Sequence, residues 1–290
     1  MKLDNPLWTA MITPMELSGR VDFESLEQLL ILQKKAGNGI LLLGSTGESL
    51  AFDPGEKKEI LSFVLQKDLQ IPLMAGIGGI HLPSALRWME YLEGLDVDCY
   101  LLTTPPYCKP GKRGQYHWFK TILEKSGKPC VLYNVPSRSG CSLNFDTVKD
   151  LAGHPNFWGV KEASGQVEDF LRYKKSAPDV KILGGDDALF PEFSSYGVDG
   201  LVSVAANVWP YATRRYVETA MSKKLQNASE WRDACQSLFT ASNPVPVKAL
   251  MAYKNMIKSN TVSPPLSSED LHNLDQLISA DLWVNKWMEK

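Results

Sequence analysis

Cysteine is scarce in this 290-residue sequence, and charge of either sign is nearly balanced. The five cysteines, at positions 99, 108, 130, 141 and 235, are widely spaced and include no C-x-x-C pair. This spacing argues against a disulfide framework or a zinc module and fits a reducing cytoplasm. Lys and Arg number 31 against 33 Asp and Glu, so the net charge of -2 gives no global field that would attract nucleic acid or an anionic membrane.

Long hydrophobic runs are also absent. No uninterrupted apolar segment reaches the roughly 18 residues of a membrane-spanning helix. The N-terminal stretch MKLDNPLWTAMITP carries an aspartate too early for a signal peptide. The composition, 44% hydrophobic and 22% charged, allows a substantial core in one large domain or two ordinary ones. We expect a soluble cytoplasmic protein with neither a membrane nor nucleic acid as partner.

Short apolar runs that end in small or polar residues recur through the first three quarters of the chain. Most are too continuous to be half-exposed, so they are typical of strands covered on both faces. The runs are 7–13, 39–44, 72–78, 98–104, 129–135, 157–162, 180–185 and 200–205.

Segments with helical spacing lie between these runs. The first has Asp22 where an N-cap is expected and Gly37 as a stop signal. Eight strands alternating with helices predict a (β/α)₈ TIM barrel. A doubly wound open sheet is the alternative, although no G-x-G-x-x-G follows an early strand. The helical segments are 22–37, 53–67, 82–95, 113–127, 144–153, 167–177 and 187–197.

The strand signals stop near residue 225. We therefore expect a catalytic barrel over 1–225 and a C-terminal helical region over 226–290, with three helices in 228–239, 246–257 and 267–283. Active sites in such barrels lie at the C-terminal ends of the strands, so polar residues there are the functional candidates.

Two loops after strands carry candidate binding groups. The stretch GSTGES at 44–49 offers hydroxyls and free backbone N–H groups that suit a small carboxylate or phosphate, or else only a turn with local hydrogen bonds. The stretch TTPPYCKPG at 103–111 presents Tyr107 on a loop stiffened by prolines, which could equally be a rigid surface loop.

Two strands carry candidate catalytic groups. Alternation along 129–135 turns Tyr133 toward the barrel mouth, and Arg138 follows with a guanidinium that can grip a carboxylate, unless both serve only local contacts. Alternation along 157–162 places Phe157, Gly159 and Lys161 on one face, with Gly159 leaving space beneath the lysine. Lys161 could instead pair with a carboxylate or lean into solvent.

Together, these groups predict Schiff-base chemistry on oxo acids, without a metal or an organic cofactor. A dry barrel favours the neutral amine, which attacks ketones. A nearby phenol and hydroxyl could carry protons through the imine steps.

The sequence resembles the class I pyruvate-dependent lyases and aldolases, which include the dihydrodipicolinate synthases and the N-acetylneuraminate lyases. The resemblance covers nearly the whole chain. It rests on GSTGES at 44–49, PPY at 105–107, YNVPSRSG at 133–140, GVKEASG at 159–165, GGDD at 184–187 and NPVPVK at 243–248.

The resemblance implies a role for each of four catalytic residues. Lys161 would form the imine with pyruvate, and Tyr133 would relay protons. Ser45 stands where the synthases more often have threonine in that relay. Tyr107 would complete the relay from the neighbouring subunit of a homodimer, often paired into a homotetramer.

The resemblance also implies four substrate-binding residues. Thr46 would bind the pyruvate carboxylate, and Arg138 would receive the carboxylate of L-aspartate 4-semialdehyde. Gly185 and Val202 match positions that line the pyruvate pocket.

The implied reaction is the condensation of pyruvate with L-aspartate 4-semialdehyde in diaminopimelate and lysine synthesis. The sequence GSTGE is also common in neuraminate lyases, so an aldolase for N-acetylneuraminate or 2-keto-3-deoxy-sugar acids is the alternative. Arg138 favours the synthase, since sialic acid lyases generally lack it. A catalytically silent oxo-acid-binding protein is a further alternative. The stretches 52–59 and 76–83, and Pro106 before the relay tyrosine, depart from lysine-inhibited synthases, so feedback inhibition by lysine is not expected.

Overall fold

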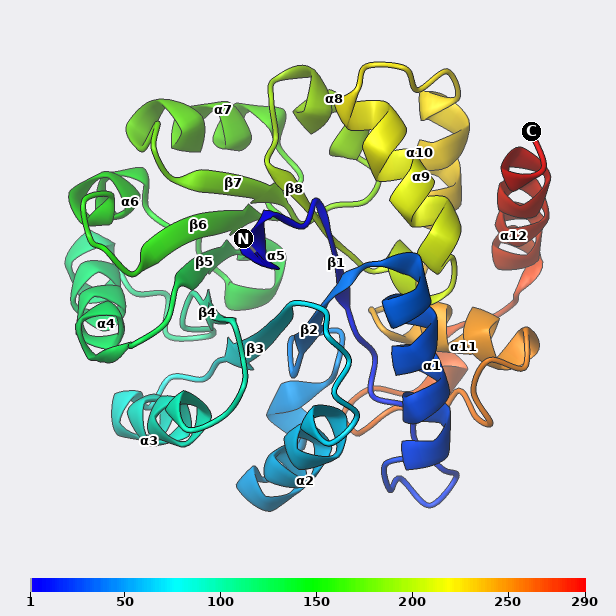
Figure 1. Ribbon diagram of the computed structural model, residues 1–290, viewed down its shortest axis with the longest axis horizontal. Helices are drawn as coiled ribbons and strands as arrows, with labels where there is room; N and C mark the ends of the chain where they lie inside the picture. The colour runs from blue at the N-terminus through cyan, green and yellow to red at the C-terminus, as the bar shows by residue number, and fades with distance from the viewer. Residues whose placement is uncertain (1) are drawn as a thin grey trace.

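Eight parallel strands close into a barrel in the computed structural model, which describes residues 2–290 (Figure 1). Each strand pairs with its neighbours in sequence, and the last pairs with the first. The predicted (β/α)₈ barrel is therefore confirmed, and the open sheet is excluded. The strands are β1 (Leu7–Ala10), β2 (Gly39–Leu42), β3 (Leu73–Ile77), β4 (Cys99–Thr103), β5 (Cys130–Asn134), β6 (Phe157–Glu162), β7 (Lys181–Gly184) and β8 (Gly200–Ser203).

Helices surround the barrel and continue beyond it. Asp22 caps the first helix by accepting from Ser25 N–H at 3.0 Å, and Gly37 ends it in the left-handed region at φ 71°, as predicted. The helices are α1 (Phe23–Ala36), α2 (Pro54–Leu65), α3 (Leu82–Glu93), α4 (Lys112–Lys125), α5 (Pro136–Ser139), α6 (Phe145–Leu151), α7 (Val167–Ser176), α8 (Phe190–Ser195), α9 (Pro210–Met221), α10 (Ala228–Ser237), α11 (Val245–Tyr253) and α12 (Asp275–Met288), with 3₁₀ turns η1 (Lys2–Asp4), η2 (Ser49–Ala51), η3 (Ala205–Asn207) and η4 (Ser268–Asp270).

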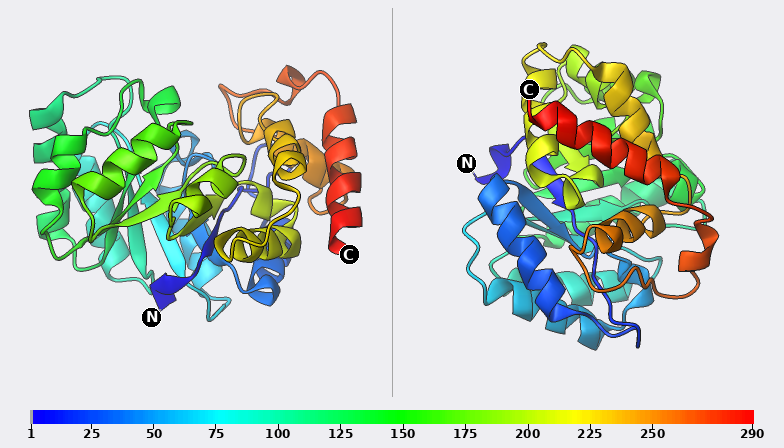
Figure 2. Two further views of the ribbon diagram at one scale, coloured as in Figure 1. Left: turned by 90° about the horizontal axis from the view of Figure 1, so that it is seen from above. Right: turned by 90° about the vertical axis from the view of Figure 1, so that its right-hand side faces the viewer.

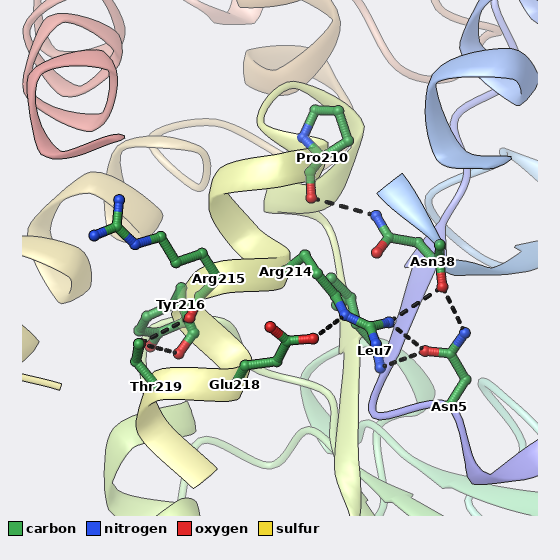
Figure 3. Close-up of polar contacts among 10 residues, drawn as sticks. Asn5, Leu7, Asn38, Pro210, Arg214, Arg215, Tyr216, Glu218 and Thr219 are labelled. Atoms are coloured by element: carbon green, nitrogen blue, oxygen red, sulfur yellow. Dashed lines mark hydrogen bonds and ion pairs between the residues drawn. The ribbon is translucent and has the colours of Figure 1, made fainter. Parts of the chain in front are cut away.

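Helix α9 follows the last strand and was not predicted, although a proline at its start is a helix signal. Arg214 ties it to the segment before β1 and to the end of α1 (Figure 3). Its Nη1 donates to Asn5 Oδ1 at 2.9 Å and to Gly37 O at 3.1 Å, while its Nε bonds Glu218 at 2.6 Å. These bonds hold α9 over the place where β8 meets β1.

The core has two layers. Large side chains fill the space between the barrel and its helices, and a smaller cluster fills the barrel itself. Trp8 is fully buried in this inner cluster and lies against Gly39, where an added Cβ would approach the indole to 2.8 Å. The barrel is therefore a packed core, and only its mouth is open to ligands.

A register irregularity in β6 corrects one expectation about its faces. The pairing with β5 runs from Cys130–Phe157 to Val131–Gly159, so Trp158 is an extra residue there. Phe157 consequently belongs to the outer layer, while Trp158 packs against the inner cluster. The prediction that Phe157 shares a face with Lys161 is wrong, because regular alternation does not survive a bulge.

The three helices expected after residue 225 are α10, α11 and α12. Figures 1 and 2 show them gathered on one side of the barrel, where α10 packs along α12 and α11 contacts η3. Across residues 2–290, no helix combines the length and apolar character needed to cross a membrane. All five cysteines are free.

Candidate active site

A cavity of about 730 Å³ opens at the C-terminal ends of the strands. Six of the eight predicted site residues line it: Ser45, Thr46, Tyr133, Arg138, Lys161 and Gly185. The C-terminal region, predicted as an appendage, also supplies part of the wall through Gln236, Phe239, Ala241, Ser242 and Asn243.

A second cavity, of about 600 Å³, lies between α10 and α12. Its lining contains acidic, amide and hydroxyl groups but no lysine, arginine, histidine, cysteine or tyrosine. It therefore offers no amine or thiol nucleophile for the chemistry predicted from the sequence.

Lys161 lines the barrel-mouth cavity and is buried, with 4% of its surface exposed. Within the described chain its Nζ makes no hydrogen bond and no ion pair, and it lies 4.2 Å from the centroid of the Tyr133 ring. The strand register explains this contact, because Tyr133 and Lys161 are direct partners across β5 and β6. Pairing with a carboxylate and leaning into solvent are both excluded, so the amine is free to meet a ligand.

Glycine at 185 makes room for this lysine. A Cβ added there would approach Lys161 Cε to 2.9 Å and Ala163 Cβ to 2.8 Å. Gly159, which was expected to provide that space, instead allows the close approach of β7, since its added Cβ would lie 3.0 Å from Lys181 O. The space comes from Gly185, directly after the neighbouring strand β7, and not from the lysine's own strand.

Tyr133 presents its phenol to the same cavity and is 5% exposed. Its hydroxyl has no hydrogen-bond partner in the part of the chain that the structure describes. The carboxylate of Glu162, the residue after Lys161 in sequence, lies on the opposite face of β6. It accepts from Asn134 Nδ2 at 2.7 Å and from Ser164 N–H at 2.6 Å. Burial raises the pKa of Glu162 to about 7, although these hydrogen bonds act to lower it. Glu162 therefore braces the strand ends, while the Tyr133 phenol shares the cavity lining with the Lys161 amine.

Three stretches distant in sequence meet at the rim of the cavity. Asn243 Nδ2 donates to Thr46 Oγ1 at 2.9 Å, and Arg138 Nη2 donates to Asn243 O at 2.9 Å. Ser45 lies beside Thr46 on the cavity lining. The hydroxyls of 44–49 and the guanidinium of α5 are thus connected through Asn243, which was not among the predicted site residues. Its only signal in the sequence is its place in the NPVPVK motif.

The model of the dihydrodipicolinate synthetase family matches residues 5–280. The chain belongs to this family. Dihydrodipicolinate synthase from Acinetobacter baumannii, described as chloride-inhibited and complexed with pyruvate, matches the structure with a TM-score of 0.90 and 30% identity over 97% of this chain and 99% of that one.

Two further relatives extend the comparison. The 4-hydroxy-tetrahydrodipicolinate synthase of Francisella philomiragia is 44% identical over 287 residues, 98% of this chain and 97% of the relative. A structure described as the first monomeric dihydrodipicolinate synthase variant has a TM-score of 0.90 and 28% identity over 97% of both chains. The named relatives confirm an enzyme of the synthase class and do not support the sugar-acid aldolase.

A buried ion pair holds the stretch GSTGES, 44–49, against the stretch NPVPVK, 243–248. Lys248 Nζ, with no exposed surface, donates to Glu48 Oε1 and to Thr261 O, the latter at 2.8 Å. Glu48 Oε2 in turn accepts from Ser263 N–H at 2.6 Å. Burial lowers the pKa of Lys248, and the Glu48 carboxylate opposes that effect. The pair fixes the loop that carries Ser45 and Thr46.

Two predicted site residues lie away from the cavity lining. Val202 is fully packed inside the barrel, in register with Trp8, and the neighbouring Val204 lines the cavity instead. Tyr107 is 90% exposed on the loop after β4, with φ 68° and its N–H bonded to Ser139 O at 3.1 Å. Tyr107 is therefore presented outward from this chain and does not line the cavity.

Proposed function

We propose that the cavity condenses pyruvate with L-aspartate 4-semialdehyde through an imine on Lys161 and releases 4-hydroxy-tetrahydrodipicolinate for diaminopimelate and lysine synthesis. The observation that carries this proposal is the Lys161 amine on the cavity lining, buried against Tyr133 and without an ionic partner among residues 2–290. The pyruvate complex of the Acinetobacter relative supports the choice of the first substrate.

The chemistry follows from the amine and the phenol. The Lys161 nitrogen adds to the ketone carbon of pyruvate, and loss of water gives the imine. Removal of a methyl proton gives an enamine, whose carbon adds to the aldehyde. The amino group of the second substrate then displaces Lys161 and closes the ring. Tyr133 carries protons at its phenol oxygen in the addition and dehydration steps, with Ser45 as the adjoining hydroxyl.

Two groups hold the carboxylates in this scheme. Thr46 and its backbone bind the carboxylate of pyruvate, while Gly185 leaves the lysine room to turn toward it. Arg138 binds the carboxylate of the aldehyde substrate, because a guanidinium offers two parallel donors to it.

Arg138→Ala tests the assignment of the aldehyde. We expect kcat/KM for aspartate semialdehyde to fall about 10²-fold or more, because a charge-assisted pair is lost, while the KM for pyruvate changes less than about threefold. Steady-state kinetics with each substrate varied in turn measures both. Arg20→Ala, at an arginine paired on the surface with Glu16, is the matched control and should leave both constants unchanged.

The wild-type enzyme should also discriminate among aldehydes. Turnover with N-acetylmannosamine or glyceraldehyde that equals or exceeds turnover with aspartate semialdehyde would reverse the substrate assignment. If Arg138→Ala instead raised the KM for pyruvate and left kcat/KM for aspartate semialdehyde unchanged, the arginine would bind pyruvate and not the aldehyde substrate.

We further propose that Tyr107 serves the cavity of a second subunit in a homodimer, which can pair into a tetramer. The 90% exposure of its ring supports this role. Lys161→Met and Tyr107→Phe should each be inactive or nearly so, yet a reassorted mixture should regain about a quarter of wild-type activity. Half of its dimers are mixed, and each mixed dimer holds one intact site. Mixed dimers seen by native mass spectrometry without regained activity would contradict a role in the partner's site.

A further inference from the structure

Asn243 occupies a bridging position between the two residues assigned to substrate carboxylates. Its side chain is 5% exposed and lines the cavity, its Nδ2 bonds Thr46 Oγ1, and its backbone oxygen accepts from Arg138. Thr46 lies on the loop after β2 and Arg138 in α5 after β5, so this one residue of the C-terminal region sets how they sit relative to each other.

The direction of the Asn243–Thr46 bond decides what the Thr46 hydroxyl can do. An amide NH₂ group only donates, so Thr46 Oγ1 must accept in this bond. The hydroxyl hydrogen is then left for another acceptor, and the Thr46 side chain makes no other hydrogen bond with the described residues. Because Thr46 lines the cavity, that hydrogen is available to a carboxylate bound there.

The other end of the same amide is not used in packing. Asn243 Oδ1 is buried and has no hydrogen-bond partner in the structure of residues 2–290. An unsatisfied buried oxygen costs stability, so an amide at this place is not explained by folding alone. The hydrogen bond from its NH₂ group to Thr46 is therefore the contact that an asparagine at this position provides.

We propose that Asn243 is a positioning residue that fixes Thr46 as a hydrogen-bond donor and thereby sets the affinity for the carboxylate of pyruvate. The inference rests on the proposed function, since it takes Thr46 as the pyruvate-carboxylate ligand. Asn243 itself forms no bond to the reacting atoms.

Asn243→Asp tests the direction of this bond while keeping the shape of the side chain. An ionised carboxylate only accepts, so Thr46 must donate to it and can no longer donate to pyruvate. We expect the KM for pyruvate to rise about tenfold or more, with kcat changed less than about threefold. Asn243→Ala, which removes the donor without adding a charge, should raise that KM in the same direction and serves if the Asp variant does not fold.

Asn273→Asp is the matched control. Asn273 is exposed, and its Oδ1 accepts from Asp275 N–H at 3.3 Å, a bond that aspartate preserves. Its pyruvate KM should equal that of the wild type. Thr46→Val gives an independent check, because it should raise the pyruvate KM in the wild type but add little in the Asn243→Asp background.

Two outcomes would overturn the inference alone: an unchanged pyruvate KM in both Asn243 variants, or additive effects of Thr46→Val and Asn243→Asp. Wild-type enzyme that does not turn over pyruvate and aspartate semialdehyde would instead overturn the proposed function, and this inference with it.

Discussion

Lys161→Met is expected to abolish turnover without weakening the fold. The nucleophile is lost, so kcat/KM should fall by about 10³- to 10⁶-fold. The fold should not suffer, because the amine makes no hydrogen bond or ion pair with the described residues and methionine fills nearly the same space. Removing a buried amine that has no ionic partner in the described part of the chain should leave the temperature of thermal unfolding unchanged or raise it. Steady-state kinetics and thermal unfolding measure the two effects.

Lys181→Met is the matched control for this substitution. Lys181 begins the neighbouring strand β7 and pairs on the surface with Asp199 at 2.9 Å. Its replacement should cost at most about 1 kcal/mol of stability and leave activity intact. Substantial activity in Lys161→Met would remove the lysine from the mechanism. A strongly destabilised Lys161→Met would show that the amine has a structural partner.

Lys248→Met is expected to have the largest effect on stability. It leaves the Glu48 carboxylate buried without its cation, which should lower the free energy of unfolding by about 3–5 kcal/mol. The loop that carries Ser45 and Thr46 should loosen with it. Urea unfolding followed by tryptophan fluorescence measures the change in the free energy of unfolding.

A double variant and a surface control isolate the ion pair. Glu48→Gln combined with Lys248→Met removes both charges and should recover much of the lost stability, since no uncompensated charge remains. Lys120→Met breaks an exposed pair with Glu124 and should change stability by less than about 1 kcal/mol. A Lys248→Met variant as stable as that control would show that the buried pair contributes little.

Most of the barrel could be predicted because buried parallel strands give continuous apolar runs, and the chain alternates them with capped helices. The faces of β6 could not be predicted fully. Its bulge depends on pairing with β5, which a local pattern does not contain, so Phe157 was placed on the wrong face. The same limit applies to Gly159, whose missing Cβ serves the neighbouring strand, and to Gly185, whose contact with Lys161 crosses from β7 to β6.

The cavity was largely predictable because strand ends converge at one mouth, which brings Lys161, Tyr133 and the Thr46 loop together. Asn243 was not, because it precedes α11 in the C-terminal region and reaches Thr46 from 197 positions away. The outward Tyr107 shows a different limit, since the structure of a single chain does not test a role in a second subunit.

Reduction with borohydride in the presence of pyruvate, followed by peptide mass spectrometry, tests the central claim most directly. The imine should be trapped as a reduced pyruvyl adduct on Lys161, at about one per chain at saturating pyruvate. Lys161→Met should yield no adduct, and Lys181→Met should be labelled like the wild type. Absence of an adduct, or an adduct on a different lysine, would contradict the account.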